Sequence, residues 1–147
     1  MYIPGLNVKA TAPYGLAILR IVLGIAFLVH GWSKLSGGVD GVGGFFGSVG
    51  IPAPGLMAWV VTLVELVGGA FLIVGFLTPI VGILLTINMI GAIIFTKLGG
   101  PFIEMGAITW EKEAVFGAAA LCLALAGPGA WSVDEVVLET RGRTARA

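Results

Sequence analysis

The sequence has 147 residues, of which 58% are hydrophobic and only 11% are charged, and its formal net charge is zero. Because a soluble domain carries about 25% charged residues, this chain has too few to cover a water-facing surface. The balanced charge gives no electrostatic basis for binding nucleic acid, and a single cysteine, Cys122, excludes an internal disulfide and a CxxC redox pair. Any redox chemistry would therefore need a bound cofactor or a partner protein.

The first apolar segment, residues 14–31, is expected to be a transmembrane helix that contains Arg20. Its apolar side chains together favour insertion by about 3–6 kcal/mol, whereas a central arginine costs about 2.5–3.5 kcal/mol. The free energy of membrane insertion of this segment is therefore favourable overall. Because Arg20 interrupts the apolar run and no A-x-A cleavage site follows, we expect this segment to be a retained span rather than a signal peptide.

A glycine-rich segment, Trp32–Pro54, follows the first span and contains Phe45 and Phe46. Glycine-rich backbone is flexible in water, whereas aromatic side chains prefer the membrane interface. We therefore expect a partly buried loop that lies against the bilayer surface.

The second and third spans are expected at residues 56–77 and 80–96. Thr78 and Pro79 predict a helix start, with threonine as the N-cap and proline at the first helical position. Since the connection between the two spans is so short, they should be antiparallel neighbours.

The fourth span is expected at residues 109–126. Glu111 and Glu113 would lie in its first turn, where the helix dipole favours acids. The sequence Gly127-Pro-Gly129 ends a helix cleanly. Ser132-Val-Asp-Glu135 then has the pattern of a capping box, which predicts a short C-terminal amphipathic helix. The sequence thus predicts an all-α polytopic membrane protein, a four-helix transmembrane bundle, as a single domain over residues 1–147.

Four spans place both termini on the same side of the membrane. That side carries four basic residues, and the opposite side carries three: Lys9, Arg141, Arg143 and Arg146 against Lys34, Lys97 and Lys112. Basic residues favour the cytoplasmic side. We therefore expect both termini to be cytoplasmic, with the chain in the cell (inner or plasma) membrane.

The ionisable and amide side chains inside the spans are the candidate site: Arg20, His30, Lys34, Glu65 and Asn88. With a rise of 1.5 Å per residue, Arg20 would lie about 9 Å, Asn88 about 12 Å, Glu65 about 18 Å and His30 about 24 Å from the cytoplasmic surface. Lys34 is one turn beyond His30 on the same helical face. These depths permit the side chains to converge.

Two interpretations of this set remain open. In the first, Arg20 and Glu65 form a structural ion pair, and Asn88 stabilises the helix contact by an interhelical hydrogen bond. In the second, the set forms a ligand or proton site, because ionisable groups at mid-membrane depth are costly and usually functional. Glu111 and Glu113 would either close the mouth of that site or only solvate the start of the fourth helix.

Small residues predict the helix contacts, since close backbone approach holds helices together in lipid. Gly24 with Gly31 in the first span, and a row of Ala118, Cys122 and Ala126 in the fourth, have the required spacing. No metal site is expected, because the chain has one histidine and one cysteine, in different helices.

At these positions the sequence resembles the DoxX family of small bacterial and archaeal membrane proteins. The resemblance covers nearly the whole chain and rests on an ordered set of short motifs: Arg20 with Gly24, His30-Gly-Trp-Ser-Lys34, Gly50-Ile-Pro52, Glu65-Leu-Val-Gly68-Gly69, Gly75-Phe-Leu-Thr78, Met89 with Ala92, an acid before the fourth span, and Gly127-Pro-Gly129 followed by Ser132-Val-Asp134. Glu111 and Glu113 both qualify as that acid. Where family members often have a basic residue after Gly-Pro-Gly, this chain has Ala130.

The resemblance implies a four-helix membrane fold and, for some members, membrane redox chemistry that includes thiosulfate–quinone oxidoreduction. Our leading hypothesis is a redox-associated subunit that binds a quinone-like ligand or docks a membrane or peripheral redox partner. The alternatives are a small transporter or permeability component and a non-enzymatic assembly factor. The sequence leaves open whether the protein is itself catalytic, and so small a bundle is compatible with a homo-oligomer.

Overall fold

The computed structural model describes residues 8–104 and 107–137. Helices dominate it: α1 (Val8–Gly37), α2 (Val39–Ser48), α3 (Pro54–Val74), α4 (Thr78–Thr96) and α5 (Glu111–Ala126). A small antiparallel hairpin of β1 (Ile103–Glu104) and β2 (Ala107–Ile108) lies between α4 and α5. The predicted all-α class is confirmed, and in the described part of the chain α1, α3 and α4 are long and apolar enough to cross a membrane.

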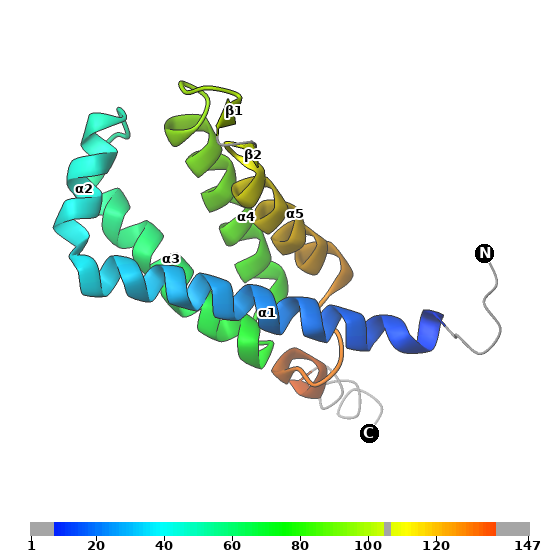
Figure 1. Ribbon diagram of the computed structural model, residues 1–147. Helices are drawn as coiled ribbons and strands as arrows, with labels where there is room; N and C mark the ends of the chain where they lie inside the picture. Colours follow the sequence, from blue (N-terminus) through cyan, green and yellow to red (C-terminus); the bar gives the residue numbers. More distant parts are fainter. Residues whose placement is uncertain (1–7, 105–106, 138–147) are drawn as a thin grey trace.

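The helices form two antiparallel pairs, α1 with α3 and α4 with α5 (Figure 1). The pairs converge near the end of α3 and diverge towards α2 and the hairpin. The apolar core lies where they meet and contains fully buried Leu72, Leu85 and Leu123 together with Leu23 and Phe27. The divergence leaves room at the other end for a cavity.

Glycines set the short distance between α1 and α3. A Cβ on Gly31 would lie 2.4 Å from the Leu66 backbone nitrogen, and one on Gly69 would lie 2.4 Å from the Leu28 nitrogen. A Cβ on Gly24 would lie 2.8 Å from the Gly69 carbonyl oxygen. The predicted role of Gly24 and Gly31 in close packing is therefore confirmed.

The small-residue row predicted for the fourth helix is wrong for contacts within the chain. Ala118 and Cys122 are exposed, and the face of α5 that packs inward carries Gly117, Ala120 and Leu123. A Cβ on Gly117 would lie 3.2 Å from the Met89 side chain of α4. Small residues occur on both faces of α5, so their spacing alone does not identify the face that packs.

The predicted loop at Trp32–Pro54 is largely helical. α1 continues through Gly37, and α2 follows after Gly38, which has a positive φ of 98°. The buried residues of α2, Val39, Gly43 and Phe46, recur at helical spacing and pack towards Ala58 of α3. Burial of this face compensates for the low helix propensity of glycine, because packing contributes more to helix stability than propensity does.

The start of α4 differs from the predicted threonine cap. Leu77, in the left-handed conformation, is the N-cap residue, and the buried Thr78 hydroxyl has no hydrogen-bond partner within residues 8–104 and 107–137. The side chain of Asp134 takes over the capping role, because its two oxygens accept the backbone N–H groups of Leu77 and Thr78, each at 2.8 Å. The capping residue thus comes from a distant part of the chain.

The C-terminal segment, residues 127–137, forms a strap across the end of the bundle where α3 meets α4, and its last part, residues 133–137, is a short helix. The Ala130 N–H donates to the Pro13 carbonyl, and the Asp134 N–H donates to the Gly75 carbonyl, both at 2.9 Å. Ser132 Oγ accepts the Glu135 N–H at 3.1 Å, and residues 133–137 are helical, which confirms the predicted capping-box start. Arg141, Arg143 and Arg146 lie outside the described residues.

Candidate functional site

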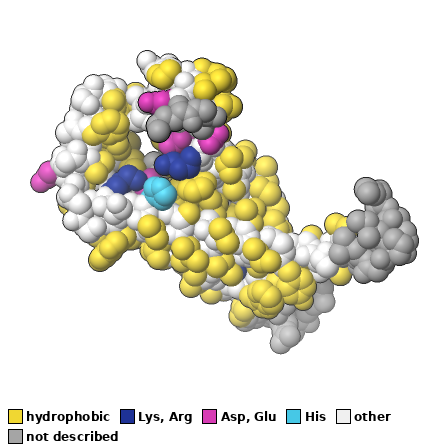
Figure 2. Space-filling view, viewed as in Figure 1, with side chains coloured by type: hydrophobic (Ala, Val, Ile, Leu, Met, Phe, Trp, Pro, Cys, Tyr) yellow, Lys and Arg dark blue, Asp and Glu magenta, His cyan; other side chains and the backbone are white. Residues whose placement is uncertain are grey.

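A cavity of about 230 Å³ lies where the two helix pairs diverge. Its wall is mostly apolar and includes phenylalanines from four helices: Phe27, Phe45, Phe46, Phe95 and Phe116. Figure 2 shows the same region as a hollow in which charged side chains and a histidine gather, whereas the visible surface beside it is largely hydrophobic. On the face that Figure 2 shows, most of the charged side chains therefore gather at this hollow.

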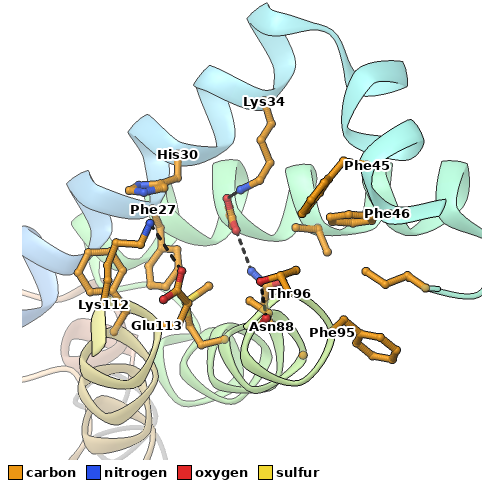
Figure 3. Close-up of a pocket in the computed structure, with 17 residues that line it drawn as sticks. Phe27, His30, Lys34, Phe45, Phe46, Asn88, Phe95, Thr96, Lys112 and Glu113 are labelled. Atoms are coloured by element: carbon orange, nitrogen blue, oxygen red, sulfur yellow. Dashed lines mark hydrogen bonds and ion pairs between the residues drawn. The ribbon is translucent and has the colours of Figure 1, made fainter. Parts of the chain in front are cut away.

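Glu65 is the centre of the polar side of the cavity. Its side chain is buried, and both carboxylate oxygens are engaged: Lys34 Nζ donates to Oε2 in an ion pair, and Asn88 Nδ2 donates to Oε1 at 2.9 Å (Figure 3). Three helices thus contribute one member each. Glu65, Lys34 and Asn88 converge, as the sequence permitted, and all three line the cavity.

The antiparallel register of α1 and α3 produces this pairing. Gly31 packs against Leu66, so Lys34, one turn further along α1, comes level with the residues just before Leu66. A buried carboxylate needs a charged or hydrogen-bonding partner, and here it has both. The side chain of Lys34 stays a quarter exposed and lines the cavity.

Arg20 does not pair with Glu65, which corrects the structural ion-pair interpretation. Its side chain is fully buried beside Gly75, and Nη2 donates to the carbonyl oxygens of Ala130 at 3.4 Å and Trp131 at 3.1 Å. Because Gly75 is the C-cap of α3, Arg20 lies at the end of that helix. The depth estimate took Tyr14 and Leu77 to be level, whereas α1 extends past the end of α3 and Arg20 itself is level with Gly75.

Arg20 therefore secures the strap and is not part of the cavity. The carboxylates of Asp134 and Glu135 interact electrostatically with the Arg20 guanidinium group. Its Nε and Nη1 have no partner among the described residues. The buried core of Leu23, Leu72 and Leu123 lies in the converging part of the bundle, while the cavity lies in the diverging part.

His30 lines the cavity, and its ring orientation is set by its own helix. Nδ1 lies 2.7 Å from the Ala26 carbonyl oxygen. Since a carbonyl only accepts, Nδ1 carries the hydrogen, and in the neutral ring Nε2 is left with a lone pair. The ring also makes an edge contact with Phe116 of α5, with centroids 6.0 Å apart. His30 is thus a fixed, half-buried proton acceptor at the cavity wall.

The two acids of the fourth helix have different positions. Glu113 is buried and lines the cavity, with Lys112 Nζ at 3.7 Å and Lys97 Nζ at 3.9 Å from its Oε1. Glu111 is exposed and lies outside the cavity wall. Of the two candidates, Glu113 is the acid that belongs to the site.

Several lining residues were not predicted from the sequence. Phe27 has a signal that could have found it, because residues 27, 30 and 34 share one face of α1 at helical spacing. Phe95 and Phe116 have the same kind of signal, since Phe95 is at i+7 from Asn88 and Phe116 is at i+3 from Glu113. Their place in the wall depends on the angle between the two helix pairs, which sequence spacing within one helix does not determine.

The arrangement combines flat apolar walls with a small polar end. Lys34 and Asn88 keep further N–H groups beyond those given to Glu65, so both can donate to a carbonyl oxygen of a ligand. His30 Nε2 can accept a hydrogen bond or a proton. Such a cavity suits an amphiphilic ring that carries carbonyl groups.

Comparison with known proteins agrees with the sequence motifs and the helical fold. The DoxX family model matches residues 15–98. "Inner membrane protein YphA" of Escherichia coli is 29% identical over 129 residues, which cover 85% of this chain and 91% of YphA. "Uncharacterized membrane protein Rv3486" of Mycobacterium tuberculosis is 33% identical over 135 residues, or 85% of this chain and 82% of that protein.

The chain therefore belongs to the DoxX family. It is a multi-pass protein of the inner membrane. A further relative, "Putative oxidoreductase CatD" of Bacillus subtilis, is 47% identical over 88 residues, which span 60% of this chain and 63% of CatD. That match therefore covers less than two thirds of CatD. No solved structure matches the chain.

Proposed function

We propose that this protein is a membrane-embedded, redox-associated subunit that binds a quinone-like ligand in the cavity around Glu65. The observation that carries the proposal is the pairing of phenylalanine walls with the Lys34–Glu65–Asn88 cluster in one cavity. A quinone head group is flat and apolar on its faces and carries carbonyl oxygens at its edge, so it matches both halves of this lining. The name of CatD as an oxidoreductase supports a redox context.

In this role Lys34 and Asn88 hold and orient a carbonyl oxygen of the head group. Glu65 positions both donors, because it accepts a hydrogen bond from each. The phenylalanines pack against the ring faces and exclude water. The electrons would come from a partner redox protein, since the chain has a single cysteine and needs a bound group for redox chemistry.

The transporter alternative receives less support from the described residues. A permeation path would have to continue from the cavity to the strap, and the buried layer of Leu23, Leu72, Leu85 and Leu123 lies across the converging part of the bundle. The cavity is thus better suited to holding a ligand than to passing a solute.

For topology, we propose that α5 is a fourth span and that both termini are cytoplasmic. The 16 residues of α5 reach about 24 Å, a few ångström short of a hydrocarbon core of about 30 Å. Its exposed face nevertheless carries Val115, Leu121 and Leu125, and α5 packs along α4. A fluorescent protein fused to the C-terminus should fluoresce in cells; a dark but inserted fusion would place that end outside.

The ligand proposal is tested by purifying the protein in mild detergent and quantifying co-purified quinones by mass spectrometry. Glu65→Gln keeps the shape of the side chain but loses the ion pair with Lys34, so we expect at least tenfold less quinone per protein. The matched control is Asp40→Asn, which neutralises an exposed acid of α2 that does not line the cavity and should retain the wild-type amount. Equal quinone content in all three proteins would refute the proposed role of Glu65.

A further inference from the structure

The cavity around Glu65 meets a second, polar cavity of about 400 Å³ beneath the hairpin. The two share Thr96, Lys112 and Glu113 as lining residues. The second cavity is otherwise lined by charged and polar residues that include Lys97, Glu104 and Glu111. This side is therefore the water-facing mouth of the site.

The opposite side of the cavity faces the gap between α2 and α4. Phe45 of α2 and Phe95 of α4 both line the cavity, yet they are 51% and 42% exposed. A side chain that is both cavity-lining and exposed marks an opening. Figure 3 shows Phe45 and Phe95 on different helices on the same side of the cavity, away from Lys112 and Glu113. Among the described residues, α2 packs mainly on α3 and has no extensive contact with α4, so this side is not closed by packed helices.

The surface of α4 continues this opening into the apolar exterior. Gly91 lines the cavity, and a Cβ placed on it would meet nothing within 4 Å. Ile87 and Ile94 lie on the same helical face as Gly91, at i−4 and i+3, and are 60% and 52% exposed. An apolar track thus runs from the cavity past Gly91 onto a lipid-facing surface.

We propose, building on the proposed function, that the ligand is a quinone with a long apolar tail and that it enters sideways from the membrane between α2 and α4. The head group passes between Phe45 and Phe95 to reach the Lys34–Glu65–Asn88 cluster. The tail stays outside, along the Gly91 face of α4, because the cavity of about 230 Å³ holds a ring but not a polyisoprenoid chain. A tail-less quinone can also reach the cavity from the side of Lys112 and Glu113, whereas a tailed quinone needs the lipid-facing entrance for its tail.

Closing the proposed entrance tests this route. Phe45→Cys and Phe95→Cys are combined with Cys122→Ser, which removes the native cysteine, exposed in the structure. The pair is bridged with a reducible bismaleimide in lipid nanodiscs. Binding is measured for menaquinone-4 and for menadione, which share a naphthoquinone head group and differ in the tail.

With the bridge in place, we expect association of menaquinone-4 to slow at least tenfold while menadione binding stays within twofold, and reduction should restore the first rate. No effect on either ligand, or an equal loss of both, overturns the sideways route. These outcomes differ from failure of the proposed function itself, in which the unbridged protein binds neither quinone. A protein that binds menadione as tightly as menaquinone-4 would overturn the assignment of a tailed ligand.

Discussion

At the residue scale, the site depends on an ion pair that the sequence did not specify. Glu65 was expected to be important because a carboxylate at mid-membrane depth is costly. Its partner could not be identified, since Arg20 and Lys34 are both on α1 and only the register with α3 distinguishes them. The glycines that set this register, Gly31 and Gly69, carry the information, but their contacts are visible only in three dimensions.

The ion pair itself can be tested through stability. Removing one partner of a buried pair costs about 3–5 kcal/mol, because the other charge is left unpaired. We expect Lys34→Met to fall near the lower end of that range, since Lys34 is a quarter exposed. The double variant Lys34→Met with Glu65→Gln should be more stable than Lys34→Met alone.

Reversible thermal or denaturant unfolding in detergent measures both variants, and the double-mutant cycle gives the coupling energy. Strictly additive effects of the two substitutions would mean that Lys34 and Glu65 do not interact.

At the scale of elements, the C-terminal strap explains motifs that sequence reasoning left without a physical role. Gly129 has a φ of 71°, and a Cβ there would lie 2.5 Å from the Pro13 carbonyl oxygen. Arg20 donates to the strap, and Asp134 caps α4. In the sequence, these residues could be taken for a functional site because they are polar and regularly spaced. In the structure, they connect the ends of α1, α3 and α4.

The cap offers a direct test of that structural role. Asp134→Ala removes the acceptor for the N–H groups of Leu77 and Thr78 and should cost about 1–2 kcal/mol of unfolding free energy. Asp134→Asn retains an oxygen that can cap and should lose only part of this. Cys122→Ala, at an exposed position of α5 away from the strap, is the control and should change stability by less than about 0.5 kcal/mol. Quinone content should be unchanged in all three, and a loss confined to Asp134→Ala would place the strap in the binding site.

The spans themselves were largely predictable, whereas the connection between α1 and α3 was not. Long apolar runs can be identified from composition alone. Most ends of the predicted spans therefore lie within a few residues of the ends of α1, α3 and α4. The glycine-rich segment was wrongly predicted to be a loop, because its helix, α2, is stabilised by packing of Val39 and Phe46 towards Ala58 rather than by its own helix propensity. Tertiary contacts of this kind have no local signature.

At the scale of the whole molecule, function follows from two helix pairs that meet at one end and part at the other. The closed end holds the apolar core and the strap, and the open end holds the cavity with α2 and the hairpin around it (Figure 1). The fold thereby combines a closed apolar base with a cavity that, in the proposed function, borders both lipid and water. The polar residues could be predicted as candidates from the sequence. Prediction of the aromatic wall would have required knowledge of the angle between the two helix pairs.

The most direct test is photoaffinity labelling with an azidoquinone, followed by mapping of the labelled residues by mass spectrometry. The binding site predicts labels on α1 between Phe27 and Lys34 and on α4 between Asn88 and Thr96. Gly91→Leu, which adds a side chain at the opening of the cavity beside the proposed entrance, should reduce them at least tenfold, whereas Gly15→Leu, at an equally open position on α1 outside the cavity, should leave them intact. Labels spread over lipid-facing residues, or unchanged by Gly91→Leu, would show that the cavity does not bind a quinone.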